Sequence, residues 1–226
     1  MSGFTYIIVI GFAIFGIHHW LKNKHYLFEP EDIAKIAKRH VGNDQKQSIN
    51  AKYTKIALEL EQKYPGHILS EGAREWLFMN AGGWTGSVYI LHASVTEYVL
   101  FFGTAVDTQG YSGRYWANVS DTILTGSFRR WKEGTLKSHV YSPGDTVYHN
   151  WGDVAAVQWT AGTWMVEYGR GFVPSTLGFA LCDSIFSLMD FVQVFKLIRM
   201  YTRALIHETL FQIFEIIKIY SPAIPK

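Results

Sequence analysis

Two acidic residues stand inside apolar, β-branched stretches, where a carboxyl group could bind a cation or transfer a proton. Glu167 follows Met165 by two positions, and Asp121 lies between Val119 and Ile123. Side chains alternate between the two faces of a strand, so each acid shares a face with these apolar neighbours. If that face is the inner one, both carboxyl groups lie in the protein interior. A buried carboxylate is costly unless it is paired or protonated, so this position indicates a functional site.

Two acids in one apolar cavity are predicted to share a proton near neutral pH, because repulsion and desolvation both oppose a second charge. Such a pair would suit a cation with apolar arms, since the ammonium meets a carboxylate while aromatic rings cover the rest. It would equally suit proton addition and removal at a carbon–carbon double bond, which needs an acid and a base. The alternatives are a solvent-facing or salt-bridged Glu167, and an Asp121 that caps a turn through Ser120 and Thr122.

The elements that position these acids are predicted within residues 80–174, a segment rich in glycine, aromatic and β-branched residues. Turn sequences separate short candidate strands, which favours a small barrel of the jelly-roll or cupin type that can enclose a ligand. The predicted strands cover residues 88–91, 95–103, 115–125, 135–141, 145–149, 154–159 and 163–168.

Cupin enzymes usually hold a metal through closely spaced histidines and a glutamate. This segment contains His92, His139 and His149, but no two of them form a His-x-His pair. A lone barrel histidine is more often a hydrogen-bonded structural residue than a metal ligand. We therefore predict neither a metal site nor another cofactor.

Residues 26–79 are predicted to be helical and to serve packing. A first helix begins at Pro30 and ends near His40, with Gly42 as its cap, and a second runs from about Gln47 to Lys63. A short third helix is predicted from Glu71 to Met79, with Ser70 as its N-cap.

Residues 1–25 are predicted to form an uncleaved transmembrane anchor. No Asp, Glu, Lys or Arg occurs before Lys22, and Trp20 stands where an interfacial aromatic belt would lie. The alternatives are a buried helix and a cleaved signal peptide, although neither a basic amino-terminal region nor a cleavage site is evident. Lys22 and Lys24 favour a cytoplasmic body. The glycosylation sequon at Asn118 would matter only if the body were lumenal.

Residues 175–226 are predicted to return to helix. One helix runs from Thr176 to Leu188, and a second opens at Asp190, where Gln193 completes a capping-box pattern. Interspersed charges argue against a membrane span, so we expect a helix pair that covers the barrel and rests in the membrane interface. An ordinary buried helix pair is the alternative. The predicted fold class is therefore an α+β membrane protein.

Composition is consistent with a ligand-enclosing or lipid-contacting protein. Hydrophobic residues make up 48% and aromatic residues 16% of the 226 residues, which is rich for a soluble domain. The formal net charge of +2 gives no reason to expect nucleic acid as a partner. Cys182 is the single cysteine, so an internal disulfide is excluded.

Several strings, in order along the chain, resemble the sigma-1 receptor family, which is related to the fungal sterol C8–C7 isomerases. They are Asn80–Trp84, Leu91–Ser94, Glu97–Ala105, Ser112–Trp116, Thr163–Gly171 and Pro174–Leu177. The resemblance covers nearly all of the chain after the anchor, and the anchor matches only in character.

The resemblance implies a homotrimer of cupin-like barrels, each with an amino-terminal membrane helix and two carboxy-terminal helices on the membrane. It implies a location in the endoplasmic reticulum membrane and nuclear envelope, with the plasma membrane and lipid droplets as further locations. It also implies that Glu167 pairs with a ligand ammonium, that Asp121 shares a proton with Glu167, and that Tyr98 orients Glu167. The rest of the implied ligand-binding lining is Met79, Trp84, Val88, Leu100, Phe102, Tyr115, Val119, Phe128, Trp159, Val173, Thr176, Leu177, Ala180 and Tyr201. Side-chain size differs from the family pattern at Met79, Thr85, Val88 and Val173, which would alter ligand preference.

Two functions follow from the resemblance. One is a non-enzymatic receptor and chaperone that binds hydrophobic amines and sterols, has a role in lipid transport and regulates membrane partners such as ion channels. The other is a sterol C8–C7 isomerase that uses Asp121 and Glu167 as acid and base. A plain membrane-anchored lipid carrier overlaps the first and would tolerate Glu167→Gln. The resemblance favours the receptor.

Overall fold

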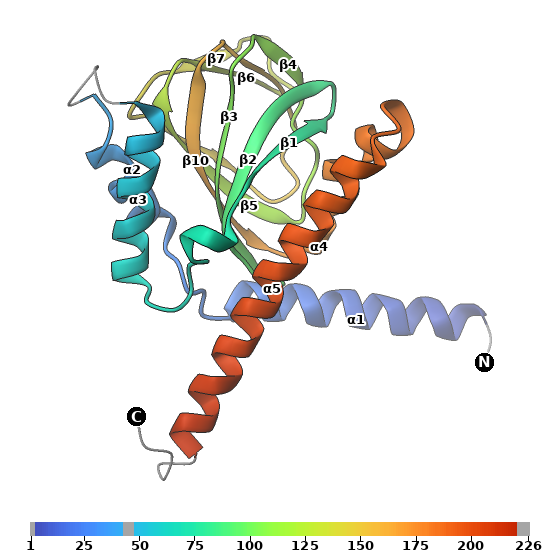
Figure 1. Cartoon of the computed structure of the whole chain (residues 1–226). Coiled ribbons are helices and arrows are strands. Elements are labelled where there is room, and N and C mark those ends of the chain that lie inside the picture. Colours follow the sequence, from blue (N-terminus) through green and yellow to red (C-terminus); the bar gives the residue numbers. More distant parts are fainter. Residues whose placement is uncertain (1–2, 43–47, 221–226) are drawn as a thin grey trace.

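Ten antiparallel strands close into a barrel in the computed structural model, which describes residues 3–42 and 48–220 (Figure 1). The larger sheet has the order β1-β2-β3-β10-β5-β8, and the smaller has the order β4-β9-β6-β7. Their bounds are β1 (Trp76–Ala81), β2 (Trp84–Ala93), β3 (Glu97–Thr104), β4 (Thr108–Tyr111), β5 (Ala117–Thr125), β6 (Phe128–Lys132), β7 (His139–Tyr141), β8 (Thr146–His149), β9 (Ala155–Trp159) and β10 (Thr163–Gly171). With an apolar amino-terminal helix and carboxy-terminal helices, this confirms the predicted α+β class.

Strand β10 is buried on both faces because one face lines the barrel and the other is covered by helices. Met165 packs inside the barrel with residues such as Phe102 and Ile123. Val166 and Tyr168 point the opposite way, into a second core beneath α2 and α3. This alternation explains why an almost continuous apolar sequence surrounds Glu167.

Helices α2 (Pro30–Arg39) and α3 (Ile49–Lys63) cover the outer face of the larger sheet (Figure 1). Pro30 opens α2, as expected, and the Ser48 hydroxyl caps α3 by accepting the backbone N–H of Ala51. The predicted start of the second helix at Gln47 lies outside the described residues.

The helix predicted from Glu71 to Met79 is wrong. Only Glu71–Ala73 forms a single 3₁₀ turn, η1, and the following residues form edge strand β1, which pairs with β2 from Trp76↔Tyr89 to Ala81↔Trp84. The glycine pair Gly82 and Gly83 provides the tight turn between these strands. Pairing with β2 therefore decides the structure of a sequence whose local pattern also fits a helix.

Helix α4 (Pro174–Cys182), the π-helical turn η2 (Asp183–Ser187) and the long helix α5 (Phe191–Tyr220) lie against one end of the barrel. Ala180, Leu197 and Met200 join the barrel core. Asp190 caps α5 as predicted, since it accepts the backbone N–H of Gln193 at 3.0 Å. The Gln193 side chain does not complete the capping box, because it donates instead to the carbonyl of Phe78.

Helix α1 (Gly3–Asn23) projects away from the barrel (Figure 1). In the described part of the chain, it is the one helix long and apolar enough to cross a membrane. Its end is fastened to the body: Leu21 is buried, the His18 ring contacts Trp151, and the Lys24 ammonium donates to Thr96.

Candidate ligand-binding site

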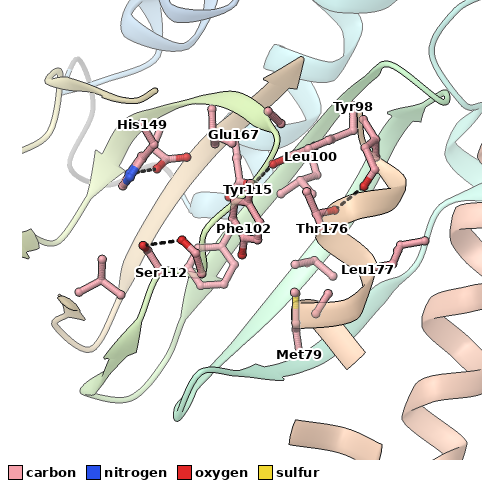
Figure 2. Close-up of a pocket in the computed structure, with 18 of the residues that line it drawn as sticks. Met79, Tyr98, Leu100, Phe102, Ser112, Tyr115, His149, Glu167, Thr176 and Leu177 are labelled. Atoms are coloured by element: carbon pink, nitrogen blue, oxygen red, sulfur yellow. Dashed lines mark hydrogen bonds and ion pairs between the residues drawn. The ribbon is translucent and has the colours of Figure 1, made fainter. Parts of the chain in front are cut away.

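The barrel encloses a cavity of about 150 Å³ between the inner faces of its sheets and α4 (Figure 2). The structure brings every predicted site residue to this cavity. These are Met79, Trp84, Val88, Tyr98, Leu100, Phe102, Tyr115, Val119, Asp121, Phe128, Trp159, Glu167, Val173, Thr176, Leu177, Ala180 and Tyr201.

The two acids face each other across neighbouring strands. Glu167 on β10 and Asp121 on β5 are direct register partners, and directly opposed residues have Cβ atoms roughly 4.5–5.5 Å apart. Both line the cavity. The alternatives of a solvent-facing Glu167 and a turn-capping Asp121 are therefore wrong, since each acid lies within a strand and faces the barrel interior.

Tyr98 holds the Glu167 carboxyl group in place. Its hydroxyl donates to Glu167 Oε1 at 2.7 Å. Gly169, the partner of Tyr98 in the β3–β10 ladder, makes room for this contact, because a Cβ atom at that position would lie 2.2 Å from the tyrosine ring. Met165, Glu167 and Gly169 share the inward face of β10, and position 169 is a glycine because the Tyr98 ring leaves no room for a side chain.

Burial raises the pKa of Glu167 from its ordinary value of 4.5 to about 8, and the negative charge of Asp121 contributes in the same direction. The hydrogen bond from Tyr98 opposes part of this rise. Glu167 therefore retains its proton near neutral pH. Burial, reinforced by the nearby acids, also holds the pKa values of Tyr98 and Tyr115 well above the ordinary value of tyrosine, so both keep their hydroxyl protons.

Aromatic and aliphatic side chains make up most of the remaining wall. Trp84, Phe102 and Trp159 pack edge to face, with ring centroids 5.3–5.5 Å apart. Leu177 and Ala180 of α4 close the cavity on the side of the carboxy-terminal helices. The site therefore combines an apolar chamber with one acid pair, an arrangement that can hold a hydrophobic cation or exchange protons with a bound apolar molecule.

Sequence reasoning missed several cavity residues, of which His149 is the most informative. Its Nε2 lies 3.2 Å from Asp121 Oδ2 (Figure 2). The pattern of histidines had suggested only a structural role, because pairing of β8 with β5 is not visible in the local sequence. The other missed residues are Ile90, Ala93, Ser112, Gly113, Ala117, Asn150, Asp153, Val157 and Leu197. Within residues 3–42 and 48–220, no group of three or more His, Cys, Asp or Glu side chains could hold a metal ion.

Solved structures of low sequence identity share part of the fold. An RmlC-like cupin from Shewanella frigidimarina aligns with 46% of this chain and 90% of its own, at 12% identity and a TM-score of 0.40.

Sequence comparison finds relatives that match most of the chain. The sigma non-opioid intracellular receptor 1 of Danio rerio is 55% identical over 205 residues, covering 89% of this chain and 90% of the relative. The protein of the same name from Xenopus tropicalis is 57% identical over 190 residues, covering 84% of each chain. The C-8 sterol isomerase erg2 of Aspergillus fumigatus is 36% identical over 211 residues, covering 90% of this chain and 85% of the relative. The family model described as "ERG2 and Sigma1 receptor like protein" matches residues 4–212, and the chain therefore belongs to that family.

Proposed function

We propose that this protein is a non-enzymatic receptor that binds hydrophobic amines and sterols inside its barrel. The observation that carries the proposal is the position of Glu167, whose carboxyl group faces an apolar cavity with Asp121 directly opposite. A protonated amine would pair with Glu167 while its apolar arms contact Trp84, Phe102 and Trp159. A sterol would fill the same chamber by apolar contact alone.

Membrane placement supports such ligands, because hydrophobic amines and sterols partition into lipid. In our proposal α1 spans the membrane of the endoplasmic reticulum or nuclear envelope, and α4 and α5 rest on the bilayer surface. A ligand would then enter from the lipid side, between these helices and the barrel. The plasma membrane and lipid droplets are further proposed locations.

We further propose that the receptor acts as a homotrimer and a chaperone, with a role in lipid transport, on membrane partners that include ion channels. Support comes from the relatives named as receptors, which match along most of their length. A ligand bound in the barrel would favour one conformation of the surface that these partners contact.

The second candidate function is sterol C8–C7 isomerisation. The relative from Aspergillus fumigatus is named for this activity and matches 90% of the chain. Glu167 and Asp121 would serve as the acid and base that move a proton on and off the sterol double bond. The higher identity to the receptors favours the first function.

One experiment tests both functions. Purified full-length protein is titrated with a hydrophobic tertiary amine, and a parallel sample is incubated with a C8-unsaturated sterol and analysed chromatographically for migration of the double bond. We expect amine binding without sterol turnover. Glu167→Gln should abolish amine binding, because it removes the partner of the cation while preserving side-chain volume.

Glu71→Gln is the matched control, since Glu71 is exposed on η1 outside the cavity, and its amine affinity should equal that of the parent protein. Retained affinity in Glu167→Gln would contradict the site assignment and favour a plain lipid carrier. Sterol turnover that disappears in Glu167→Gln would identify an isomerase instead.

A further inference from the structure

Two exposed tryptophans lie beside the end of α1. Trp116 belongs to the connection between β4 and β5, and Trp151 belongs to the connection between β8 and β9. Their rings stack, with centroids 6.3 Å apart and an angle of 9° between the ring planes. The His18 ring of α1 meets Trp151 edge to face at a centroid distance of 5.1 Å. A row of three rings therefore joins two loops of the barrel to the apolar helix.

Both tryptophans combine an exposed ring with an unused indole N–H. Trp116 is 51% exposed and Trp151 is 37% exposed. Among the residues that the structure describes, neither indole N–H has a protein acceptor. Trp131 on β6 is 52% exposed, but its indole N–H donates to the carbonyl of Thr135. An apolar ring with a free N–H suits the boundary between lipid and water, where tryptophan is enriched in membrane proteins.

The position of His18 along α1 sets the depth of the tryptophan pair. Residues 4–17 carry no charged side chain, His18 follows them directly, and the first lysine is Lys22. At a rise of about 1.5 Å per residue, His18 lies about 8 Å from the end of α1 at Asn23. The polar layer on each side of a bilayer is roughly 5–8 Å thick. If α1 spans the membrane, His18 and the Trp151 ring in contact with it lie where the hydrocarbon core meets this layer.

Further contacts hold the loops and α1 in this arrangement. The backbone N–H of Trp151 donates to Asn118 Oδ1 at 2.8 Å, which fixes the β8–β9 connection to β5. Leu21 follows His18 by three positions and is buried against the body. Residues three apart share a face of a helix, so one face of α1 contacts the barrel. Figure 1 shows α1 leaving the body at the end of the barrel opposite β6 and β7.

We propose that Trp116 and Trp151 form a docking surface for the headgroup layer of the membrane that α1 spans. Their rings lie beside the first carbons of the lipid chains, and their indole N–H groups donate to ester or phosphate oxygens of the lipid. This contact holds the barrel itself against the bilayer and fixes its angle to α1. The inference rests on the proposed span of α1 and goes beyond the proposed function, which assigns membrane contact to helices alone.

The test is photolabelling of the full-length protein in phosphatidylcholine vesicles, which requires no variant. One sample contains lipid with a carbene-forming diazirine near the glycerol, and another contains lipid with the diazirine at the end of the acyl chain. Tandem mass spectrometry locates the labelled residues. The probe near the glycerol should label Trp116 and Trp151 several-fold more than Trp131. The chain-end probe should label residues 8–14 of α1 and neither tryptophan.

Single-cysteine variants measure the same contact by a second method. In a Cys182→Ser background, Trp116→Cys and Trp151→Cys carry a polarity-sensitive dye in vesicles whose lipid headgroups carry a nitroxide. Trp131→Cys is the matched control, because Trp131 and Trp116 are about equally exposed. Quenching should be several-fold stronger at positions 116 and 151 than at position 131.

Label in residues 8–14 without label at Trp116 and Trp151 would overturn the inference and leave the proposed span of α1 intact. Absence of label from residues 8–14 would overturn the span and the inference together. A blue-shifted dye at position 116 that the headgroup nitroxide does not quench would indicate contact with a second copy of the chain, which also overturns the inference. Amine binding is tested separately by Glu167→Gln, so its outcome remains independent of these results.

Discussion

Two glutamates on adjacent strands, Glu97 and Glu167, differ in how their charge is satisfied. Glu97 accepts hydrogen bonds from the backbone N–H groups of Leu27 and Phe28 and from the Tyr168 hydroxyl, all at 2.9–3.0 Å. In the described residues Glu167 accepts one hydrogen bond, from Tyr98. Glu97 is therefore a structural acid that joins the segment before α2 to the sheet, whereas Glu167 is left available to a ligand.

Because Glu167 accepts only one hydrogen bond from the described part of the chain, we predict that its ionised carboxyl group lowers the free energy of unfolding of the ligand-free protein. The unfolded chain releases the Glu167 proton above its ordinary pKa of 4.5, but the folded protein holds it up to about 8. The folded state thus binds more protons across this range, and its stability falls as the pH rises. Glu167→Gln should remove this loss and stabilise the protein by about 3 kcal/mol at pH 7.

Thermal unfolding in detergent between pH 4 and pH 8 checks this prediction. The melting temperatures of the two proteins should coincide at the acidic end and separate as the pH rises. A Glu167→Gln variant that melts below the parent at neutral pH would show that the carboxyl group stabilises the fold.

At this scale, strand alternation predicted that Glu167 shares a face with Met165 and that Asp121 shares one with Val119 and Ile123, but it did not decide which face is the inner one. The structure places these faces inside the barrel. The role of Glu97 was not predictable in the same way, since two of its donors, Leu27 and Phe28, belong to a segment about 70 residues earlier in the chain. The position of His149 beside Asp121 was not predicted, for a related reason. Its partner depends on the β5–β8 ladder, which only the folded chain reveals.

The elements were predicted where their local signals were strong, as in α2 and β10, and missed where long-range pairing decides. Strands β4 and β6 were not predicted because Thr108–Tyr111 contains a glycine and Phe128–Lys132 is largely charged. Both become strands by pairing with β9, which lies between them. Edge strand β1 became a strand in the same way, through β2.

Helix α4 contributes Thr176, Leu177 and Ala180 to one side of the cavity. A cavity of about 150 Å³ is smaller than the roughly 300–1,000 Å³ typical of sites for drug-sized ligands, so the chamber must widen on binding. Asp183, which directly follows α4, contacts the turn between β1 and β2: its Oδ2 accepts the backbone N–H of Gly83 at 2.9 Å. Phe179 packs beside it, against Gly82.

Asp183→Ala should therefore speed both association and dissociation of a hydrophobic amine by roughly threefold, since a partly exposed hydrogen bond contributes less than about 1 kcal/mol. The equilibrium affinity should change little, because the closed and open states both keep the acid pair. Stopped-flow binding to the purified full-length protein measures the two rates. Asp183→Asn, which keeps an oxygen acceptor, should resemble the parent, and unchanged rates in Asp183→Ala would mean that α4 does not limit entry.

Considered as a whole molecule, the protein leaves apolar surface uncovered on one side. Helix α5 packs against the barrel through Gln193, Leu197, Met200, Ala204 and Glu208. Its opposite side is also apolar and exposed, through Phe191, Phe195, Ile198, Ile206, Ile213, Phe214 and Ile217. A helix with two apolar sides needs a second apolar environment. Since α1 is exposed along nearly all of its length, a lipid bilayer would cover both helices.

We expect the exposed side of α5 to lie in lipid, which a single-dye experiment can measure because Cys182 is the only cysteine. In a Cys182→Ser background, the substitutions Phe195→Cys and Phe214→Cys carry a polarity-sensitive dye, and the protein is reconstituted into vesicles containing nitroxide-labelled lipid. Leu136→Cys is the control. Leu136 is 99% exposed and lies in the connection between β6 and β7. Figure 1 shows these two strands at the opposite end of the barrel from the carboxy-terminal half of α5.

Quenching by the lipid label should be several-fold stronger at both α5 positions than at position 136, because nitroxide quenching requires contact in the bilayer. Equal, weak quenching at all three positions would place α5 in water, with α1 in the membrane. Strong quenching at position 195 alone would limit the interface to the half of α5 that covers the cavity. Even then, a ligand could pass from lipid to Glu167 without crossing water, because only α4 and the first turns of α5 would lie between the bilayer and the cavity.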